Sequence, residues 1–144
     1  MTRPSGRRGK KKEPSWIEEL DALTIHDRVL GFHGGMKGTR DQGLLESAPA
    51  RPRQYHSYSK SADIIEMAAL YTSGIVRNHP FLDGNKRTGF VIGILFLELN
   101  GFDFIASEED AALAVLALAA GTVDEAGYAA WLRENSRRQK RSQG

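Results

Sequence analysis

Apolar residues recur three or four positions apart along most of the chain, which is the spacing of helices. The clearest pattern spans residues 61–77 and predicts an amphipathic helix. Its apolar face carries Ile64, Ala68, Tyr71 and Ile75. No segment shows the alternation typical of a strong strand, so we expect an all-α fold. The helices that the pattern predicts span residues 16–33, 43–50, 61–77, 85–99, 107–120 and 123–135.

One of these predicted helices has no polar face. From Phe90 to Leu97 every residue except Gly93 is apolar, and Asn100–Gly101 then provides a helix-ending signal. A helix that is apolar on all sides lies in the middle of a bundle. We therefore expect a helical bundle built around a hydrophobic central helix, residues 85–99.

Residues 52–60 interrupt the helical pattern. Proline disfavours helical backbone at the residue before it, so we expect the helix 43–50 to end before Pro52. The residues that follow, Pro-Arg-Gln-Tyr-His-Ser-Tyr-Ser-Lys, alternate weakly in polarity. This stretch is interpreted as a small extended flap.

The formal net charge of +2 conceals an uneven distribution of charge. Residues 1–12 contain six Arg or Lys and no acid, and residues 133–144 contain five against one Glu. The remainder is acidic, with nine basic and seventeen acidic residues. Because the end segments have too few apolar residues to fold, we expect disordered basic tails at 1–14 and 137–144 and one domain at 15–136. No aromatic residues interleave with the basic ones, so nucleic acid is an unlikely partner.

Composition excludes several classes of site. The chain of 144 residues has no cysteine, which excludes disulfides, zinc–thiolate sites and thiol nucleophiles. The longest apolar run is too short to span a bilayer, and no apolar stretch follows the basic N-terminus as it would in a secretory signal. We expect a cytoplasmic protein with no membrane partner. Neither a P-loop nor a serine-hydrolase motif is present.

Side chains that can bind a ligand or take part in catalysis are concentrated in one segment, Asn78–Thr88, at the start of the predicted central helix. The first turn of a helix offers unpaired N–H groups and the positive end of a dipole. Gly84 allows close approach to the backbone, and Asn85, Lys86 and Arg87 add donors and positive charge. This combination predicts an anion site, with phosphate as its natural occupant.

Two further side chains extend this prediction to catalysis. Asp83 would repel a phosphate directly but is suited to a Mg²⁺ ion that lies between the two. His79 can accept a proton from an incoming hydroxyl. A base, a metal ligand and an anion site within nine residues indicate phosphoryl or nucleotidyl transfer. The alternative is a capped helix in which His79 is buried and hydrogen-bonded and Asp83 complements the dipole. That alternative explains any one residue better than it explains the set.

At these residues the chain resembles a known family. The segment His79–Arg87 is similar to the Fic/Doc signature H-[P/x]-F-x-[D/E/N]-[G/A]-N-[G/K]-R at all nine positions. The segment Gly38–Ala48, followed by Arg51–Pro52, resembles the stretch G-x-R-D-x-G-L-L-E-S-A-x-x-x-P of the death-on-curing (Doc) branch. The resemblance covers about Leu23 to Trp131.

The resemblance implies an α-helical protein and a role for each matching residue. His79 would be the catalytic base, Asp83 the Mg²⁺ ligand and Phe81 the anchor of the loop in the core. The nucleotide phosphates would be bound by Gly84, Asn85, Lys86 and Arg87. The flap 52–60, with Arg53, Gln54 and Tyr55, would dock the protein target as an added strand.

Within this family, the residue at position 86 indicates which group of ATP is transferred. Members of the family that transfer AMP have Gly there, whereas this chain has Lys86, as Doc toxins do. The resemblance therefore implies ATP and Mg²⁺ as cofactors, transfer of the γ-phosphoryl group to a threonine of elongation factor Tu, and a cognate antitoxin as partner. The alternatives are AMP transfer, towards which Pro80 and Gly84 point, and a non-catalytic binding module.

His26 and His33 lie seven positions apart on the first predicted helix and could share a face. No other ligand-type residues stand near them at metal-binding spacing. We interpret them as ordinary packing or surface histidines.

Overall fold

The computed structural model describes residues 13–140. This part of the chain is mostly helical, which confirms the all-α prediction, and it also contains one small sheet. Its elements are α1 (Glu19–His33), α2 (Gln42–Tyr58), α3 (Ile64–Val76), α4 (Asn85–Leu99), β1 (Phe102–Phe104), α5 (Glu108–Ala120), α6 (Glu125–Glu134) and β2 (Ser136–Arg138).

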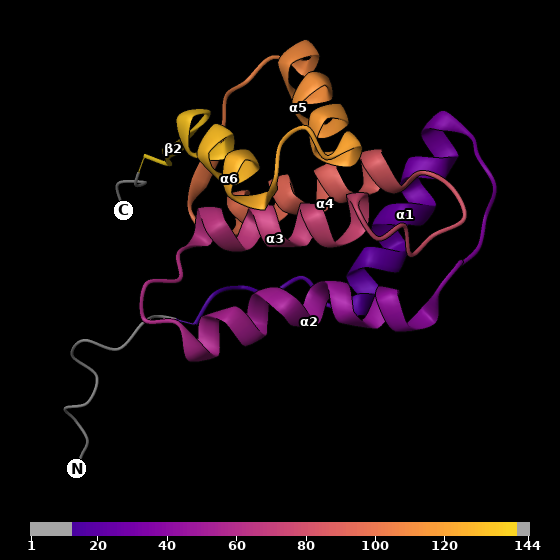
Figure 1. The fold of residues 1–144 in the computed structure, drawn as a ribbon, viewed down its shortest axis with the longest axis horizontal. Coiled ribbons are helices and arrows are strands. Elements are labelled where there is room, and N and C mark those ends of the chain that lie inside the picture. Colours follow the sequence, from indigo (N-terminus) through magenta and orange to yellow (C-terminus); the bar gives the residue numbers. More distant parts are fainter. Residues whose placement is uncertain (1–12, 141–144) are drawn as a thin grey trace.

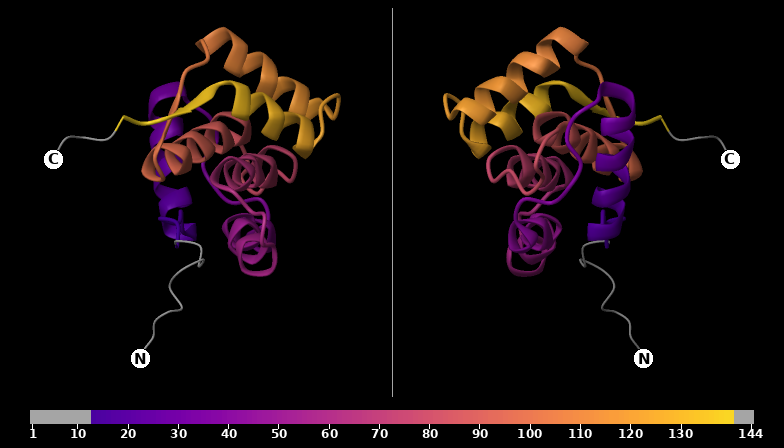
Figure 2. Two further views of the ribbon diagram at one scale, coloured as in Figure 1. Left: turned by 90° about the vertical axis from the view of Figure 1, so that its left-hand side faces the viewer. Right: turned by 90° about the vertical axis from the view of Figure 1, so that its right-hand side faces the viewer.

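The helices are arranged in layers around α3 and α4, which lie side by side in the middle (Figure 1). Helix α2 packs against α3 from one side, and α5 and α6 cover the other side. Helix α1 contacts α4, and Figure 2 shows that it crosses the other helices steeply. The loop between α3 and α4 is thereby placed at one end of the central pair, close to α1.

The central position is shared by two helices. Helix α4 has the predicted bounds, and Ile92, Phe96 and Leu97 in it are fully buried. Helix α3 is buried further, with ten of its thirteen residues inaccessible against seven of fifteen in α4. The reason is that α3 contacts α2, α4, α5 and α6, and its small residues let these neighbours approach.

Two glycines of α4 allow α3 and α4 to approach each other closely. A Cβ atom at Gly89 would lie 2.8 Å from Cγ2 of Val76 and 3.1 Å from the carbonyl oxygen of Thr72. A Cβ atom at Gly93 would overlap the hydroxyl of Thr72, which donates a hydrogen bond to the Gly89 carbonyl at 2.8 Å. The spacing of the two helices, and hence the geometry of the loop that joins them, depends on these glycines.

We expect Gly89→Ala to lower the free energy of unfolding by about 1–3 kcal/mol, because the added methyl group meets the backbone of α3. Gly31→Ala is the matched control: its Cβ atom would meet nothing within 4 Å on an exposed turn of α1. It should raise the free energy of unfolding by about 0.5–1 kcal/mol. Chemical denaturation of both variants measures the difference, and equal stabilities would contradict the assigned packing.

The predicted flap is wrong. Helix α2 continues through Pro49 and Pro52 to Tyr58, so residues 52–58 are helical. The reason is tertiary: the ring of Pro52 is buried and Tyr55 packs against the core, and this burial outweighs the local preference against helix before proline.

The C-terminal boundary also differs from the prediction. Strand β2 pairs antiparallel with β1, so that Arg137 lies opposite Asp103 and Arg138 opposite Phe102. The guanidinium of Arg138 lies 5.3 Å from the centre of the Phe102 ring. Residues 137 and 138 are therefore part of the domain, where we expected a disordered tail.

Glu13 belongs to the predicted N-terminal tail, yet it accepts a hydrogen bond from the Trp16 ring at 2.6 Å. Residues 1–12 and 141–144, where the rest of both tails falls, lie outside the described residues.

Across residues 13–140, no helix combines the length and the apolar character that a membrane crossing requires.

Candidate active site

The loop between α3 and α4 is anchored in the core by Phe81, whose side chain is 1% exposed. Asn85 closes this loop from the first turn of α4. Its side-chain Oδ1 accepts from the Phe81 N–H and its Nδ2 donates to the Phe81 carbonyl, both at 3.0 Å. The anchoring role implied for Phe81 is thus confirmed. The side-chain amide of Asn85 is used within the loop, so this residue offers a ligand only its backbone N–H.

His79 is exposed to solvent on this loop. The interpretation of His79 as a buried, hydrogen-bonded histidine is therefore wrong. Its backbone is left-handed, with φ of 52°, and it is the one described non-glycine residue with positive φ. Such a conformation is unfavourable for most residues and persists where the surroundings hold it. The ring is accessible to an incoming hydroxyl group, as a catalytic base requires.

An extended segment, residues 34–41, holds the His79 loop in place. Thr39 forms an antiparallel bridge with Phe81, and the Leu82 N–H donates to the Gly38 carbonyl at 3.0 Å. The guanidinium of Arg40 donates to the carbonyls of His79 and Asn78 at 2.6 and 2.7 Å. The backbone N–H of Arg40 donates to the Pro80 carbonyl at 2.7 Å.

Arg40 thus donates hydrogen bonds to three consecutive carbonyls of the loop that carries His79. Its neighbour Asp41 caps α2, accepting from the Leu44 N–H at 3.0 Å. The extended element beside the candidate site is therefore 34–41, where we had expected 52–60. The resemblance of Gly38–Ala48 to the Doc-branch stretch had pointed to this segment, but it gave no role to Arg40.

We expect Arg40→Gln to lower the transfer rate about ten- to a hundredfold, because a loop that is no longer clamped misplaces His79. Arg53→Gln is the control, since Arg53 pairs with Glu18 on another part of the surface. Thermal unfolding and steady-state rates of both variants separate loss of positioning from loss of fold. An Arg40→Gln protein as active as the parent would contradict the clamp.

Asp83 is exposed beside the start of α4, with its carboxylate fixed by two amides. Oδ2 accepts from the Met36 N–H at 3.1 Å and Oδ1 from the Gly84 N–H at 3.0 Å. Each oxygen retains a free lone pair. Asp83 does not cap the helix, because the N-cap position of α4 is Gly84 and no side chain bonds there. The interpretation of Asp83 as a helix cap is wrong.

The first turn of α4 is open to an anion. Its first hydrogen bond runs from the Thr88 N–H to the Gly84 carbonyl at 3.0 Å, so the amides of residues 85–87 have no partner within the helix. Gly84 is left-handed, with φ of 77°. Lys86 and Arg87 are exposed, and neither forms an ion pair with any described residue. Unpaired backbone donors and two cations without an ion-pair partner among the described residues therefore lie in the same helical turn.

The described residues fit Mg²⁺ bound together with a nucleotide. They contain no group of three or more His, Cys, Asp or Glu side chains that could hold a metal ion by itself. Mg²⁺ in phosphoryl-transfer sites is typically held by one or two carboxylates and by the phosphates of the substrate. Asp83 beside the open amides of α4 is suited to that arrangement, with the phosphates on the amides and the ion between.

Comparison with known proteins decides the family. The model of the Fic/DOC family matches residues 16–97, which include the catalytic loop and the segment 34–41. The chain belongs to the Fic/Doc family. The protein kinase doc of Escherichia phage P1 is 37% identical over 117 residues, covering 81% of this chain and 92% of the relative. The toxin Doc of Mycolicibacterium smegmatis (strain ATCC 700084 / mc(2)155) is 34% identical over 92 residues, covering 63% of this chain and 68% of the relative.

His26 is a residue of this Fic/Doc site that the sequence did not reveal. It lies on α1, is 5% exposed, and its Nε2 is 2.9 Å from the Asp83 carbonyl oxygen. We had interpreted it with His33 as a packing or surface histidine. His33 is exposed, as expected, but nothing in the spacing of α1 indicates that His26 contacts a loop 57 residues away.

The residues assigned to the target-docking flap lie away from the Fic/Doc loop. Arg53, Gln54 and Tyr55 are twelve or more residues along α2 from Asp41, whose N–H bonds to Pro80. Twelve helical residues span about 18 Å, so these three are not brought to His79. Arg53 instead pairs with Glu18 at 2.7 Å. The phenol of Tyr55 donates a hydrogen bond to Glu66 at 2.8 Å, and this bond raises the pKa of Tyr55.

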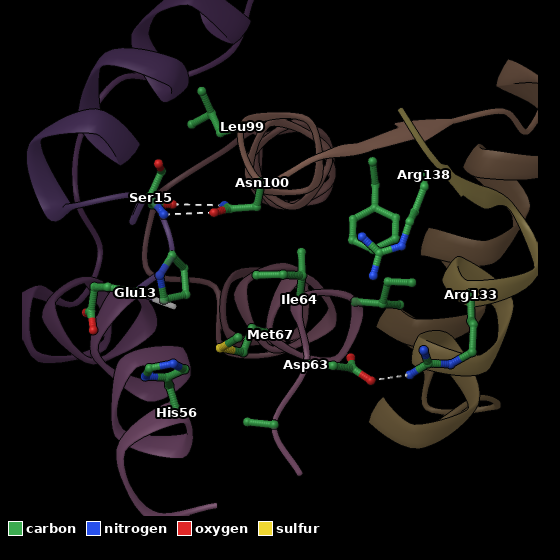
Figure 3. Close-up of a pocket in the computed structure, with 14 residues that line it drawn as sticks. Glu13, Ser15, His56, Asp63, Ile64, Met67, Leu99, Asn100, Arg133 and Arg138 are labelled. Atoms are coloured by element: carbon green, nitrogen blue, oxygen red, sulfur yellow. Dashed lines mark hydrogen bonds and ion pairs between the residues drawn. The ribbon is translucent and has the colours of Figure 1, made fainter. Parts of the chain in front are cut away.

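A groove of about 700 Å³ lies at the opposite end of α3 from the Fic/Doc loop (Figure 3). Ile64, at the start of α3, lies in its wall, together with His56 and Arg138. Ser15 and Asn100 close one side through two hydrogen bonds of 2.7 and 3.0 Å. None of the predicted catalytic or nucleotide-binding residues lines this groove.

Proposed function

We propose that this chain is a Doc-type toxin that transfers the γ-phosphoryl group of ATP to a threonine hydroxyl of a protein such as elongation factor Tu, and so arrests translation. One observation carries the proposal: an exposed histidine, a fixed carboxylate and the open first turn of a helix meet on one clamped loop. The naming of one relative as a protein kinase supports this reaction for the family branch.

In this mechanism each residue has a distinct task. A ring nitrogen of His79 accepts the proton as the O–H bond of the target breaks. The hydroxyl oxygen forms a bond to the γ-phosphorus, the bond from that phosphorus to the β–γ bridging oxygen breaks, and ADP leaves. Asp83 would hold Mg²⁺, which when bound neutralises charge on the phosphate oxygens.

Positive charge and backbone donors bind the phosphates. The amides of residues 85–87 form hydrogen bonds to the phosphate oxygens, at the positive end of the α4 dipole. Lys86 and Arg87 add cations at the same turn. Lys86 occupies the position that is Gly in AMP-transferring members of the family, and its side chain favours binding with the γ-phosphoryl group towards the target.

We further propose a cognate antitoxin as partner. Three large apolar side chains are exposed on the loop, on the segment 34–41 bonded to it and in the last turn of α1: Leu82 at 48%, Met36 at 63% and Phe32 at 83%. Clustered apolar exposure of this kind marks a protein-binding surface. A partner that covers these side chains would also restrict access to His79.

Mass measurement of elongation factor Tu tests the reaction. The target is incubated with the protein, ATP and Mg²⁺, with ATP omitted as control. A mass increase of one phosphoryl group supports the proposal. An increase of one adenylyl group would show AMP transfer, and an unmodified target bound by a growth-inhibiting protein would show a binding module.

A further inference from the structure

His26 contacts two residues of the loop between α3 and α4 and lies beside a third. Its ring stacks on Phe81, with centres 3.7 Å apart and planes inclined by 4°. Its Nε2 is 2.9 Å from the carbonyl oxygen of Asp83. A Cβ atom at Gly84 would lie 3.7 Å from the same ring nitrogen. One buried side chain of α1 therefore contacts the anchor of the loop and the carboxylate residue, and it lies beside the first residue of the anion site.

The contact with Asp83 determines the orientation of the peptide that joins Asp83 to Gly84. In a trans peptide the C=O and N–H groups point in opposite directions. With the carbonyl oxygen held at His26, the Gly84 N–H points away from α1, and there it donates to Oδ1 of Asp83 at 3.0 Å. If this peptide rotated, its carbonyl would turn away from α1, and the Asp83 carboxylate would lose one of its two amide partners.

A second side chain of α1, that of Leu30, also lies close to the loop. Leu30 follows His26 by four positions and therefore lies on the same helix face. Its Cδ2 atom would be 3.2 Å from a Cβ atom at Gly84 and 2.9 Å from one at Gly35. A side chain at position 84 would be crowded by Leu30 and would also have to adopt the left-handed φ of 77°, so both features favour glycine there.

We propose that His26 is a positioning residue of the transfer site, which fixes the Asp83–Gly84 peptide and through it the Asp83 carboxylate and the open amides of α4. The proposal deepens the proposed function and rests on it for the identity of the ligand. His26 touches neither the phosphates nor the target hydroxyl. It acts by donating a hydrogen bond from Nε2 to the Asp83 carbonyl in a part-buried contact.

Two substitutions separate the donor from the ring. His26→Phe keeps an aromatic ring that can stack on Phe81 but removes the donor. His26→Gln keeps an N–H donor near the position of Nε2 but removes the ring. His33→Phe, on the exposed end of the same helix, is the matched control. Each protein is titrated with Mg·ATP by calorimetry, and the exchange rate of the Gly84 amide is measured by NMR without ligand.

We expect His26→Phe to raise the Kd for Mg·ATP about tenfold or more, and His26→Gln to raise it no more than about threefold. The Gly84 amide should exchange faster in His26→Phe than in the parent, in His26→Gln or in His33→Phe. Parent-like Mg·ATP affinity and Gly84 exchange in His26→Phe would overturn the assignment. If the parent itself binds no Mg·ATP, the proposed function fails, while the Gly84 exchange rates still test the positioning role.

Discussion

His79→Asn is expected to lower the rate of transfer to the target hydroxyl by a factor of about 10² to 10⁴, the usual contribution of a general base. Asparagine tolerates the left-handed backbone that residue 79 adopts, so the loop keeps its shape, but its amide cannot accept the proton. The side chain is exposed, and its replacement leaves no cavity. Single-turnover rates with saturating ATP measure the chemical step.

His33→Asn provides the control for this variant, because His33 is also exposed and lies outside the catalytic loop. It should transfer at the parental rate. Both variants should unfold at the parental temperature. If His79→Asn retained the parental rate while folded, another group would have to act as the base, and the role of His79 would be refuted.

Asp83→Asn is expected to reduce transfer by at least about a hundredfold and to remove most of its dependence on Mg²⁺ concentration. The single amide oxygen can accept from the Met36 N–H or from the Gly84 N–H but not from both, because these two groups bond to different carboxylate oxygens. The variant therefore loses one of these hydrogen bonds as well as the negative charge that would hold the ion. Transfer rates measured across a Mg²⁺ titration, with thermal unfolding as the check on stability, distinguish the two effects.

Asp110→Asn, in the exposed first turn of α5, is the matched control and should leave the Mg²⁺ dependence unchanged. A folded Asp83→Asn protein that needed Mg²⁺ at the parental concentration would contradict the assignment of Asp83 as the metal ligand. The amide contacts at this residue would then have only a structural purpose.

The sequence predicted the fold well where the start and end of a helix are determined by residues close to them in the chain. Helix α4 begins after a left-handed glycine and ends before Asn100–Gly101, and both signals act within a few residues. The prediction failed at Pro52, where a local preference competes with burial against α3. It also missed β2, because Ser136–Arg138 is a strand only through its pairing with β1, more than thirty residues earlier.

Distance along the chain also decided which residues of the candidate site could be predicted from the sequence. His79, Asp83 and the amides of residues 85–87 follow one another in the chain, so their proximity could be predicted from the sequence. Arg40 and His26 reach the loop from elements 38 or more residues away. The stretch Gly38–Ala48 matches the family pattern, but neither that match nor the helical spacing of α1 shows that these side chains contact the loop. The residues proposed to act chemically, and the anchor Phe81, could therefore be predicted from the sequence, whereas the contacts of Arg40 and His26 with the loop were found only from the structure.

The most direct test of the central claim follows the label from ATP. Elongation factor Tu is incubated with the parent or with His79→Asn, in the presence of Mg²⁺ and of ATP labelled at either the α- or the γ-phosphorus. We expect the parent to transfer the γ label alone and His79→Asn to transfer almost none. Transfer of the α label by the parent, or undiminished transfer of the γ label by His79→Asn, would contradict the central claim.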